Sequence, residues 1–333
     1  MQSGSHPNSI VKVAAPARLH LGFLDLNGSL GRKFGSIGLA INSHQTHIEI
    51  KSSSSTVINS IEQHQKIKEI VDLFYTTLGQ DVATEQRHIE LTVKELIPEH
   101  AGFGSGTQLA LTIGTALCQF HQVSAQTGEI ANQLGRGSRS GIGIATFDHG
   151  GFIIDGGQSN KSTIPPLLVH SLFPENWRIV LIMDNEHQGV HGSEELSAFK
   201  ELETFPLANS QAICHLTLMK LLPALTEQDL PSFGQAVTDI QTLIGDHFAP
   251  AQGGRYSSDS VAQILNHALK LGYNGIAQSS WGPTGCVFVE SDEVAKTLCS
   301  ELKQFSQLTN MQNLSFIVAT ADLSGANIEI ISA

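Results

Sequence analysis

The sequence predicts an α+β protein that folds in two halves. Short stretches with the alternation of strands dominate the first half, and longer stretches with helical spacing dominate the second. Hydrophobic residues make up 41% of the 333 residues, which allows two domains with packed cores. We expect one domain over residues 1–175 and the other over residues 176–333.

The first half is expected to hold a sheet with three helices. Its predicted strands span residues 10–15, 19–26, 37–41, 46–50, 88–93 and 150–155. A turn at Asn27-Gly28 separates the second strand from the third. The predicted helices span residues 60–78, 108–117 and 125–134, the first of them with a regular apolar stripe.

The second half is expected to hold more helix than strand. Helical spacing predicts helices over residues 211–222, 229–244, 258–271 and 292–305. Apolar runs predict strands over residues 177–183, 275–278, 286–289, 316–320 and 327–330. Helices and strands therefore follow one another without a repeat, as in an α+β domain.

Charge and composition exclude several classes of protein. Acidic residues outnumber basic ones by 31 to 19, and no basic stripe or tail is visible, which argues against nucleic-acid binding. The four cysteines are scattered in apolar contexts, which favours reduced, buried thiols. No apolar run is long enough to cross a bilayer. We expect a cytoplasmic protein that acts on small molecules and contacts neither nucleic acid nor membrane.

A glycine- and hydroxyl-rich turn leads directly into an apolar helix at residues 98–117. Glycines let backbone N–H groups converge, and a helix start adds the positive end of its dipole. This arrangement predicts an anion cradle for phosphate or diphosphate. The residues that form it are Gly102, Gly104, Ser105, Gly106 and Thr107. The alternative is a helix that Ser105 or Thr107 merely caps, with glycines for turning.

Two groups of cations stand out in this acidic chain. Residues 16–33 place Arg18, His20, Arg32 and Lys33 near Asp25 and several glycines. Residues 135–143 place Arg136 and Arg139 in a second glycine-rich stretch. Arginines clamp phosphate oxygens well, so both groups are candidates for anion binding. The alternatives are ordinary surface residues for the first group and a mobile surface loop for the second.

Two further stretches are candidates for contact with a ligand. His187 and His191 have helical spacing and precede two carboxylates, which would suit a metal, but the glycines between them favour a polar loop that covers substrate. Residues 278–285 hold Ser280, Trp281 and Thr284 between two apolar strands. Trp281 is a candidate for stacking on an aromatic ring, and the alternative is a rigid turn with a core tryptophan.

The order of these motifs resembles the GHMP kinase superfamily over nearly the whole chain. Pro98, Gly102, Gly104, Ser105 and Gly106 follow its second motif, and residues 282–285 follow its third. The resemblance implies an N-terminal domain like ribosomal protein S5 domain 2 and a ferredoxin-like C-terminal domain. Where many of these kinases carry an aspartate as catalytic base, the alignment through residues 140–151 places Gly143.

Longer blocks resemble one family inside that superfamily. Residues 15–40, 150–155 and 278–284 look like β-ribofuranosylaminobenzene 5′-phosphate synthases. The resemblance implies that 5-phosphoribosyl 1-diphosphate and 4-aminobenzoate give the aryl riboside phosphate, CO2 and diphosphate, in tetrahydromethanopterin biosynthesis. It leaves two alternatives: a small-molecule kinase that uses ATP without a carboxylate base, and a sensor without catalysis.

The same resemblance implies roles for the candidate residues. Catalytic roles fall to Arg18, His20, Asp25 and Arg32; phosphate binding to Gly102, Gly104, Ser105, Gly106, Thr107, Lys33, Arg136 and Arg139; substrate binding to Ser280, Trp281 and Thr284. Asp25 is also the expected ligand of Mg²⁺. We expect no organic cofactor, and we expect the protein to form a homodimer.

Overall fold

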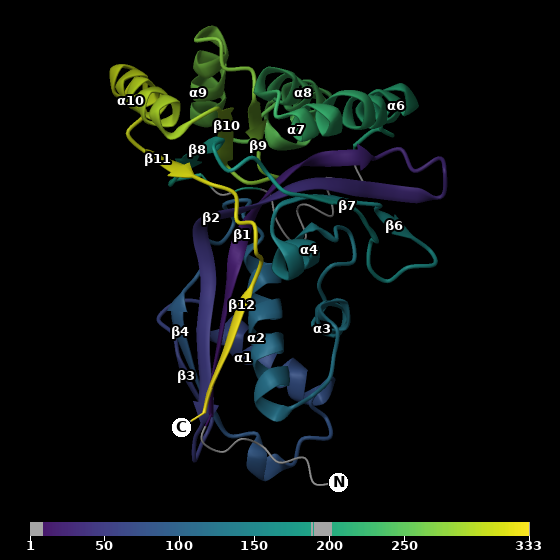
Figure 1. Ribbon diagram of the computed structural model, residues 1–333, viewed down its shortest axis with the longest axis vertical. Coiled ribbons are helices and arrows are strands. Elements are labelled where there is room, and N and C mark those ends of the chain that lie inside the picture. The colour runs from purple at the N-terminus through teal and green to yellow at the C-terminus, as the bar shows by residue number, and fades with distance from the viewer. Residues whose placement is uncertain (1–8, 188, 190–201, 333) are drawn as a thin grey trace.

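The computed structural model describes residues 9–187, 189 and 202–332, and it contains two sheets. Long strands and their helices form one end of the molecule in Figure 1, and the helices of the second half gather at the other. Within the described residues, none of the helices combines the length and hydropathy that crossing a membrane requires.

Two long strands lie at the centre of the first sheet. β1 (Ser9–Asp25) pairs antiparallel with β2 (Arg32–Ser52), and register shifts fall between Pro16 and Ala17 and between His20 and Gly22. The sequence predicted four shorter strands here, and that prediction was wrong in its number. Bulges bend a strand without ending it, so β1 carries its second part, with Arg18 and His20, toward the other half.

Shorter strands complete the first sheet. They are β3 (Val57–Asn59), β4 (Ile89–Glu95), β5 (Phe152–Asp155), β6 (Gln158–Ser159) and β7 (Leu167–Ser171). The main path runs β12-β1-β2-β4-β3, while β5 and β6 pair with β2, and β7 pairs with β5. The sequence predicted β4 and β5 but missed the three short or edge strands.

Helices cover this sheet and bury its apolar side. They are α1 (His64–Thr76), the short 3₁₀ turn η1 (Thr84–Gln86), α2 (Ser105–His121), α3 (Thr127–Gln133) and α4 (Ile142–His149). Side chains from all four α-helices share one core cluster with the sheet. α4 was not predicted, because its first turn lies in a glycine-rich stretch that favours a loop.

The second sheet is antiparallel and has the order β11-β8-β10-β9. Its strands are β8 (Arg178–Asp184), β9 (Ile276–Gln278), β10 (Thr284–Val289) and β11 (Leu314–Ala319). The helices are α6 (Leu207–Leu216), the π-turn η2 (Thr217–Leu221), α7 (Leu222–Glu227), α8 (Leu230–Gln252), α9 (Asp259–Lys270) and α10 (Asp292–Leu308). The helix predicted over residues 211–222 is thus part of α6, η2 and α7.

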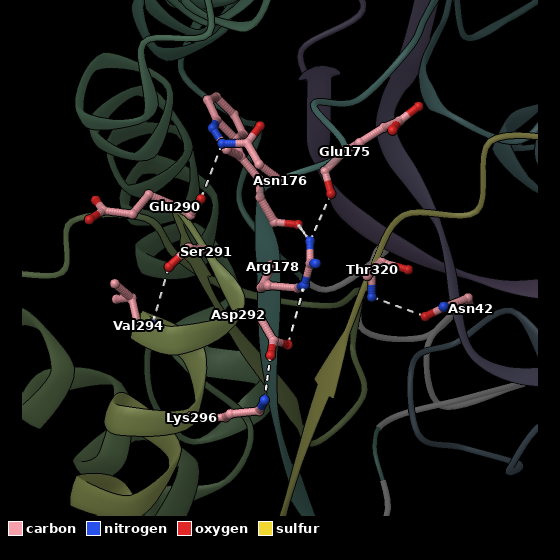
Figure 2. A network of polar contacts seen from close by, with 11 residues as sticks. Asn42, Glu175, Asn176, Arg178, Glu290, Ser291, Asp292, Val294, Lys296 and Thr320 are labelled. Atoms are coloured by element: carbon pink, nitrogen blue, oxygen red, sulfur yellow. Dashed lines mark hydrogen bonds and ion pairs between the residues drawn. The ribbon is translucent and has the colours of Figure 1, made fainter.

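The last strand returns to the first sheet. β12 (Asn327–Ser332) pairs antiparallel with β1 and runs down beside it in Figure 1. On the way, the N–H of Thr320 donates to Oδ1 of Asn42 at 3.0 Å, as Figure 2 shows, and the N–H of Asp322 donates to the carbonyl of Ala40. The end of the chain therefore ties the two halves together, and the boundary near residue 175 stays a prediction.

One core cluster also joins the halves. It includes Leu19 and Phe103 from the first half and Phe233, Trp281 and Phe288 from the second. Because these side chains share one core, this part of β1, which also carries Arg18 and His20, is held against the second half.

Candidate active site

A cavity of about 250 Å³ opens where the two halves meet. We call it the arginine cavity. Its cationic walls are Arg18, Arg136 and Arg139, and its ring-bearing walls are His20, Phe23 and Phe34. The remaining lining comes from Thr107, Gly135, Gly137, Ser138, Ser140, Gly143 and Ser280. Residues far apart in sequence therefore converge on one polar site, as the anion-binding hypothesis predicts.

The first glycine loop, residues 101–104, packs tightly on the second half of the chain. A Cβ on Gly102 would collide with the carbonyl oxygen of Ser279, and a Cβ on Gly282 would collide with the backbone of Gly102. The hydroxyl of Ser279 donates to the carbonyl of Gly102 at 2.7 Å. The glycines of both motifs thus permit two backbones to touch, which fixes the start of α2 relative to the second half.

Two arginines lie over the start of α2. A Cβ on Gly104 would lie 2.9 Å from Nε of Arg18, and a Cβ on Gly106 would lie 3.3 Å from Nη1 of Arg136. Arg18 also donates to the carbonyl of Gly102. The first N–H groups of a helix lack intrahelical partners, so an anion here would meet the helix start and both guanidinium groups.

Among the predicted phosphate-binding residues of this loop, Thr107 lines the arginine cavity directly. Gly104 and Gly106 lie behind the two arginines, and Ser105 begins α2 between them. Burial lowers the pKa of Arg136, because desolvation disfavours its charged form. A bound anion would offset that cost.

His20 is buried between the arginines and the second half. The backbone N–H of His20 donates to Oγ of Ser279 at 3.0 Å, and its backbone carbonyl accepts from the N–H of Ser280 at 3.0 Å. Burial, followed by the charges of Arg18 and Arg139, lowers the pKa of His20 to about 3. The imidazole is therefore neutral at physiological pH and can accept a hydrogen bond.

The second glycine loop, residues 135–141, presents Arg136 and Arg139 to the cavity and is anchored from behind. Asp155, only 1% exposed, accepts from the N–H of Gly141 at 2.9 Å and from the hydroxyl of Ser140 at 3.2 Å. Burial raises the pKa of Asp155, and these hydrogen bonds act against that rise. The carboxylate of Asp155 therefore holds the loop in place and does not line the cavity.

Gly143, which the family resemblance aligns with the catalytic aspartate of many kinases, lies in the cavity wall. A Cβ there would lie 2.8 Å from Cγ2 of Thr107, and its carbonyl accepts from Nε2 of Gln108 at 2.8 Å. None of the described residues that line the cavity is an aspartate or a glutamate. Within the described lining, the site holds cations, hydroxyls and aromatic rings but no carboxylate base.

Three predicted residues of the first block lie outside the cavity lining. Oδ1 of Asp25 accepts from the N–H groups of Asn27 and Gly28 and from Oγ of Ser210, at 2.7, 3.1 and 2.7 Å. Nη1 of Arg32 donates to the carbonyls of Gly156 and Gly157, at 3.2 and 2.8 Å. Lys33 lines a separate cavity with His247 and Phe205.

A metal site at Asp25 receives no support from its surroundings. In the part of the chain that the structure describes, no three His, Cys, Asp or Glu side chains gather to hold a metal ion. The carboxylate of Asp25 closes the turn after β1 instead. The predicted pair of His187 and His191 lies partly outside the described residues, because His191 is not among them.

The third motif lies partly at the cavity. Ser280 lines it, with a φ of 56°. Trp281 is 4% exposed and packs on Phe248, with ring centroids 4.4 Å apart. Thr284 is fully buried in β10, away from the cavity lining. Trp281 borders instead a small side pocket of about 30 Å³.

Sequence reasoning missed several residues of the site. Phe23 and Phe34 give the arginine cavity its apolar wall, and Gln108 holds Gly143 in place. Phe23 stood inside a block that already carried candidate cations, so its position was an available clue. No clue in the sequence marked Gln108, because its hydrogen-bond partner, Gly143, lies 35 residues away.

Comparisons with known proteins agree with this arrangement. The family model for the GHMP kinases N terminal domain matches residues 65–151, and the model for the GHMP kinases C terminal domain matches residues 221–307. The β-ribofuranosylphenol 5′-phosphate synthase of Methanocaldococcus jannaschii is 36% identical over 297 residues, which cover 82% of this chain and 87% of that protein. The chain belongs to the β-ribofuranosylphenol 5′-phosphate synthase family, within the GHMP kinase superfamily.

Two further members of that synthase family match over similar lengths. The protein of Archaeoglobus fulgidus is 34% identical, with 85% of this chain and 89% of that protein covered. The protein of Methanothermobacter thermautotrophicus is 31% identical, with 84% and 88% covered. The resemblance that the sequence motifs predicted is therefore confirmed, and the synthase relatives do not favour the kinase alternative.

Solved structures with low identity share the fold. Lactococcus lactis galactokinase, complexed with galactose, superposes with a TM-score of 0.72 at 14% identity and covers 96% of this chain and 95% of its own. A putative homoserine kinase from Listeria monocytogenes gives 0.66 at 15%, with 96% and 99% covered. The predicted two-domain α+β fold of the GHMP kinase type is confirmed.

Proposed function

We propose that this chain is a decarboxylating phosphoribosyltransferase. It joins 5-phosphoribosyl 1-diphosphate to a benzoate with an electron-donating para group and releases CO2 and diphosphate. The observation that carries the proposal is the arginine cavity, which three arginines and two phenylalanines line, without a carboxylate base among the described lining residues. Arginines bind phosphate oxygens through charge-assisted hydrogen bonds, and the apolar wall can pack against an aromatic ring.

The family resemblance implies 4-aminobenzoate as the arene and tetrahydromethanopterin biosynthesis as the pathway. The relatives are named for a product that carries the ribofuranosyl phosphate on a phenol ring. That name supports 4-hydroxybenzoate as the second candidate. Both arenes push electron density from the para position onto the ring carbon that bears the carboxylate, so the proposed chemistry is the same for each.

The first step is departure of diphosphate from C1 of the ribose. The C1–O bond breaks with its electron pair going to diphosphate, and C1 becomes oxocarbenium-like. Arg18, Arg136 and the start of α2 stabilise the negative charge that develops on the leaving group. Arg139 and Ser138 stand on the same cavity wall for the other phosphate of the substrate.

The second step forms the carbon–carbon bond. The carboxylate-bearing carbon of the arene attacks C1 with a ring electron pair, and the bond to the carboxylate then breaks. Its electron pair returns to the ring, CO2 leaves and aromaticity is restored. Phe23 and Phe34 hold the ring in line with C1, which lowers the entropic part of the barrier.

A kinase with ATP is the alternative function. Many such kinases use a carboxylate base that takes the proton of the acceptor alcohol, whereas this alternative is a kinase that works without such a base. Gly143 offers no such group, and its contact with Thr107 leaves no room for a side chain without a local shift. A ligand sensor without catalysis would bind the same substrates and form no product.

Several expectations remain proposals beside the reaction. Mg²⁺ would accompany the diphosphate, and no step above depends on it or on an organic cofactor. The protein is proposed to act in the cytoplasm as a homodimer on small molecules, without nucleic acid or membrane as a partner.

The test is incubation of the protein with 5-phosphoribosyl 1-diphosphate and carboxyl-labelled 4-aminobenzoate or 4-hydroxybenzoate. We expect labelled CO2, with diphosphate in equal amount, from at least one arene. ADP formed from ATP and an alcohol, without CO2 from either arene, would establish the kinase instead. Thermal stabilisation by the substrates without product would establish the sensor.

A further inference from the structure

A small side pocket adjoins the arginine cavity. The two share three wall residues, His20, Phe23 and Ser280. The side pocket holds about 30 Å³, whereas the arginine cavity holds about 250 Å³. A water-sized group needs roughly 10–15 Å³, so the side pocket admits about two such groups but no aromatic ring.

Aromatic faces form one side of this pocket. Phe248 packs on Trp281 with centroids 4.4 Å apart and on Phe23 with centroids 6.4 Å apart. His20 lies against Phe23, with ring centroids 4.5 Å apart. The imidazole therefore lies among rings, at the wall that the side pocket and the arginine cavity have in common.

Two buried amides on the other side of the pocket are already engaged. Nε2 of Gln241 donates to the carbonyl of Leu21 at 2.7 Å, and Oε1 accepts from the N–H of Gln278 at 3.0 Å. Oε1 of Gln278 accepts from the N–H of Ser257 at 2.7 Å. These bonds hold the walls in place, so the pocket keeps its small size.

We propose that this side pocket receives the para substituent of the arene and that the imidazole of His20 accepts the hydrogen bond which the substituent donates. The inference rests on the proposed function. It assigns the pocket a small hydroxyl or amino group on an aromatic acid, and it makes His20 a residue that selects the substrate.

The geometry of a para-substituted benzoate fits this division of space. Its substituent and its carboxylate-bearing carbon lie at opposite ends of the ring. With the substituent beside His20, the ring lies along Phe23, and the reacting carbon points into the arginine cavity where C1 of the ribose is expected.

The hydrogen bond also helps the reaction. As the ring attacks C1, positive charge develops on the para nitrogen or oxygen and its N–H or O–H becomes more acidic. A neutral imidazole that accepts a hydrogen bond from this group stabilises the charge, and no proton is transferred. When CO2 leaves, the electron pair of its bond returns to the ring, and the substituent keeps its hydrogen.

The first test uses the unaltered protein and two pairs of arenes. Each of 4-aminobenzoate and 4-hydroxybenzoate is compared with its fully methylated form, 4-dimethylaminobenzoate and 4-methoxybenzoate. Methylation keeps the electron donation but removes the donor hydrogen and enlarges the group. We expect kcat/KM to fall about tenfold or more for the methylated partner of the reactive arene. Equal turnover within a pair would overturn the proposal.

Variants test which residue makes the selection. His20→Phe keeps a ring but loses the acceptor, so the preference for the unmethylated arene should shrink by about tenfold. His267→Phe is the matched control, because His267 stacks on Phe305 in the second half, with centroids 3.9 Å apart, and should leave the preference unchanged. An unchanged preference in a folded His20→Phe protein would contradict the role of His20.

A second variant guards against loss of folding in the first. Ile244 lines the side pocket, and its Cδ1 would lie 2.7 Å from a Cβ on Gly22. Ile244→Val removes that methyl and enlarges the pocket, so the methylated arene should gain relative to its partner. No gain would count against the pocket. Absence of CO2 from all four arenes in the unaltered protein would instead defeat the proposed function and this inference with it.

Discussion

The two glycine-rich loops have similar compositions and lie in different surroundings. The first glycine loop is wedged between β1 and the motif at residues 279–282, so that glycine is required where backbones touch. The second glycine loop meets open space only at Gly135 among its three glycines, because a Cβ on Gly137 would collide with Ile144 and one on Gly141 would collide with the backbone of Pro165. This loop also carries Arg136 and Arg139 into the cavity. Glycine therefore permits close packing in both loops, and the second loop presents charge as well.

This difference changes how the anion site is understood. The first loop alone suggested a phosphate cradle, yet Arg18 and Arg136 cover its helix start. Binding depends on both loops, because the helix start comes from one and two of the three cavity arginines come from the other. Substitution of the packed glycines should therefore act on stability, and substitution of the cavity arginines on substrate binding.

The largest expected effect is on stability, from Gly102→Ala. The added Cβ collides with the carbonyl of Ser279, and the φ of 84° is costly for alanine, so we expect a loss of about 3 kcal/mol in the free energy of unfolding. Gly254→Ala is the control, because its Cβ would lie 3.5 Å from the nearest atom and change stability by about 0.5 kcal/mol or less. Denaturant titrations measure both, and equal changes would break the comparison.

The next effect is on catalysis, from Arg136→Gln and, in the same way, Arg18→Gln. Loss of one guanidinium on the leaving diphosphate should lower kcat/KM about a hundredfold, or roughly 2.7 kcal/mol. Arg178→Gln is the matched control. Arg178 donates to the carbonyl of Glu175 at 2.7 Å and lies 3.6 Å from Asp292, in the network of Figure 2. If all three variants kept kcat/KM within about twofold of the unaltered protein, the arginines would lose their assigned role.

The third effect is on acid stability, through His20, whose pKa depends on Arg18 beside the first loop and on Arg139 in the second. The folded protein holds His20 neutral down to a pKa of about 3, whereas the unfolded chain binds its proton near 6.5. Stability is therefore lost as pH falls below 6.5, by about 2 kcal/mol at about pH 5 from this group. His20→Gln should flatten the pH dependence of unfolding, and an unchanged slope would refute the assignment.

The smallest effect is expected in the cavity wall, where α2 and α4 touch. Gly143→Ala places a Cβ 2.8 Å from Cγ2 of Thr107 and should cost about 1 kcal/mol in unfolding free energy. Thr107→Ser removes that methyl, so the double variant should recover most of the loss relative to Thr107→Ser alone. Additive losses would mean that the two residues do not press on each other.

The sequence predicted most of what local pattern determines. The glycine-rich turn before α2 and the apolar stripe of α1 followed from composition and spacing. Charge and family resemblance marked Arg18, Arg136 and Arg139 as candidates, but only the structure shows that the three line one cavity. α4 did not follow from local pattern, because its first residues favour a loop and its position depends on contact with α2. Tertiary packing outweighs local propensity there.

Other features depend on contacts that sequence proximity does not reveal. Arg32 and Lys33 are neighbours on β2, but successive strand residues face opposite ways, and the two side chains reach different parts of the molecule. The side pocket needs Gln241, Ile244 and Phe248 of α8 beside β1, more than 200 residues away in sequence. No local pattern marks such a site.

The most direct measurement is a crystal structure of the protein with 5-phosphoribosyl 1-diphosphate. The account predicts diphosphate oxygens in the arginine cavity, against the guanidinium groups of Arg18 and Arg136 that cover the start of α2, with the ribose beside Gly143. Substrate bound elsewhere, or an empty arginine cavity at saturating substrate, would contradict the claim that two differently built glycine loops together form the phosphoribosyl site.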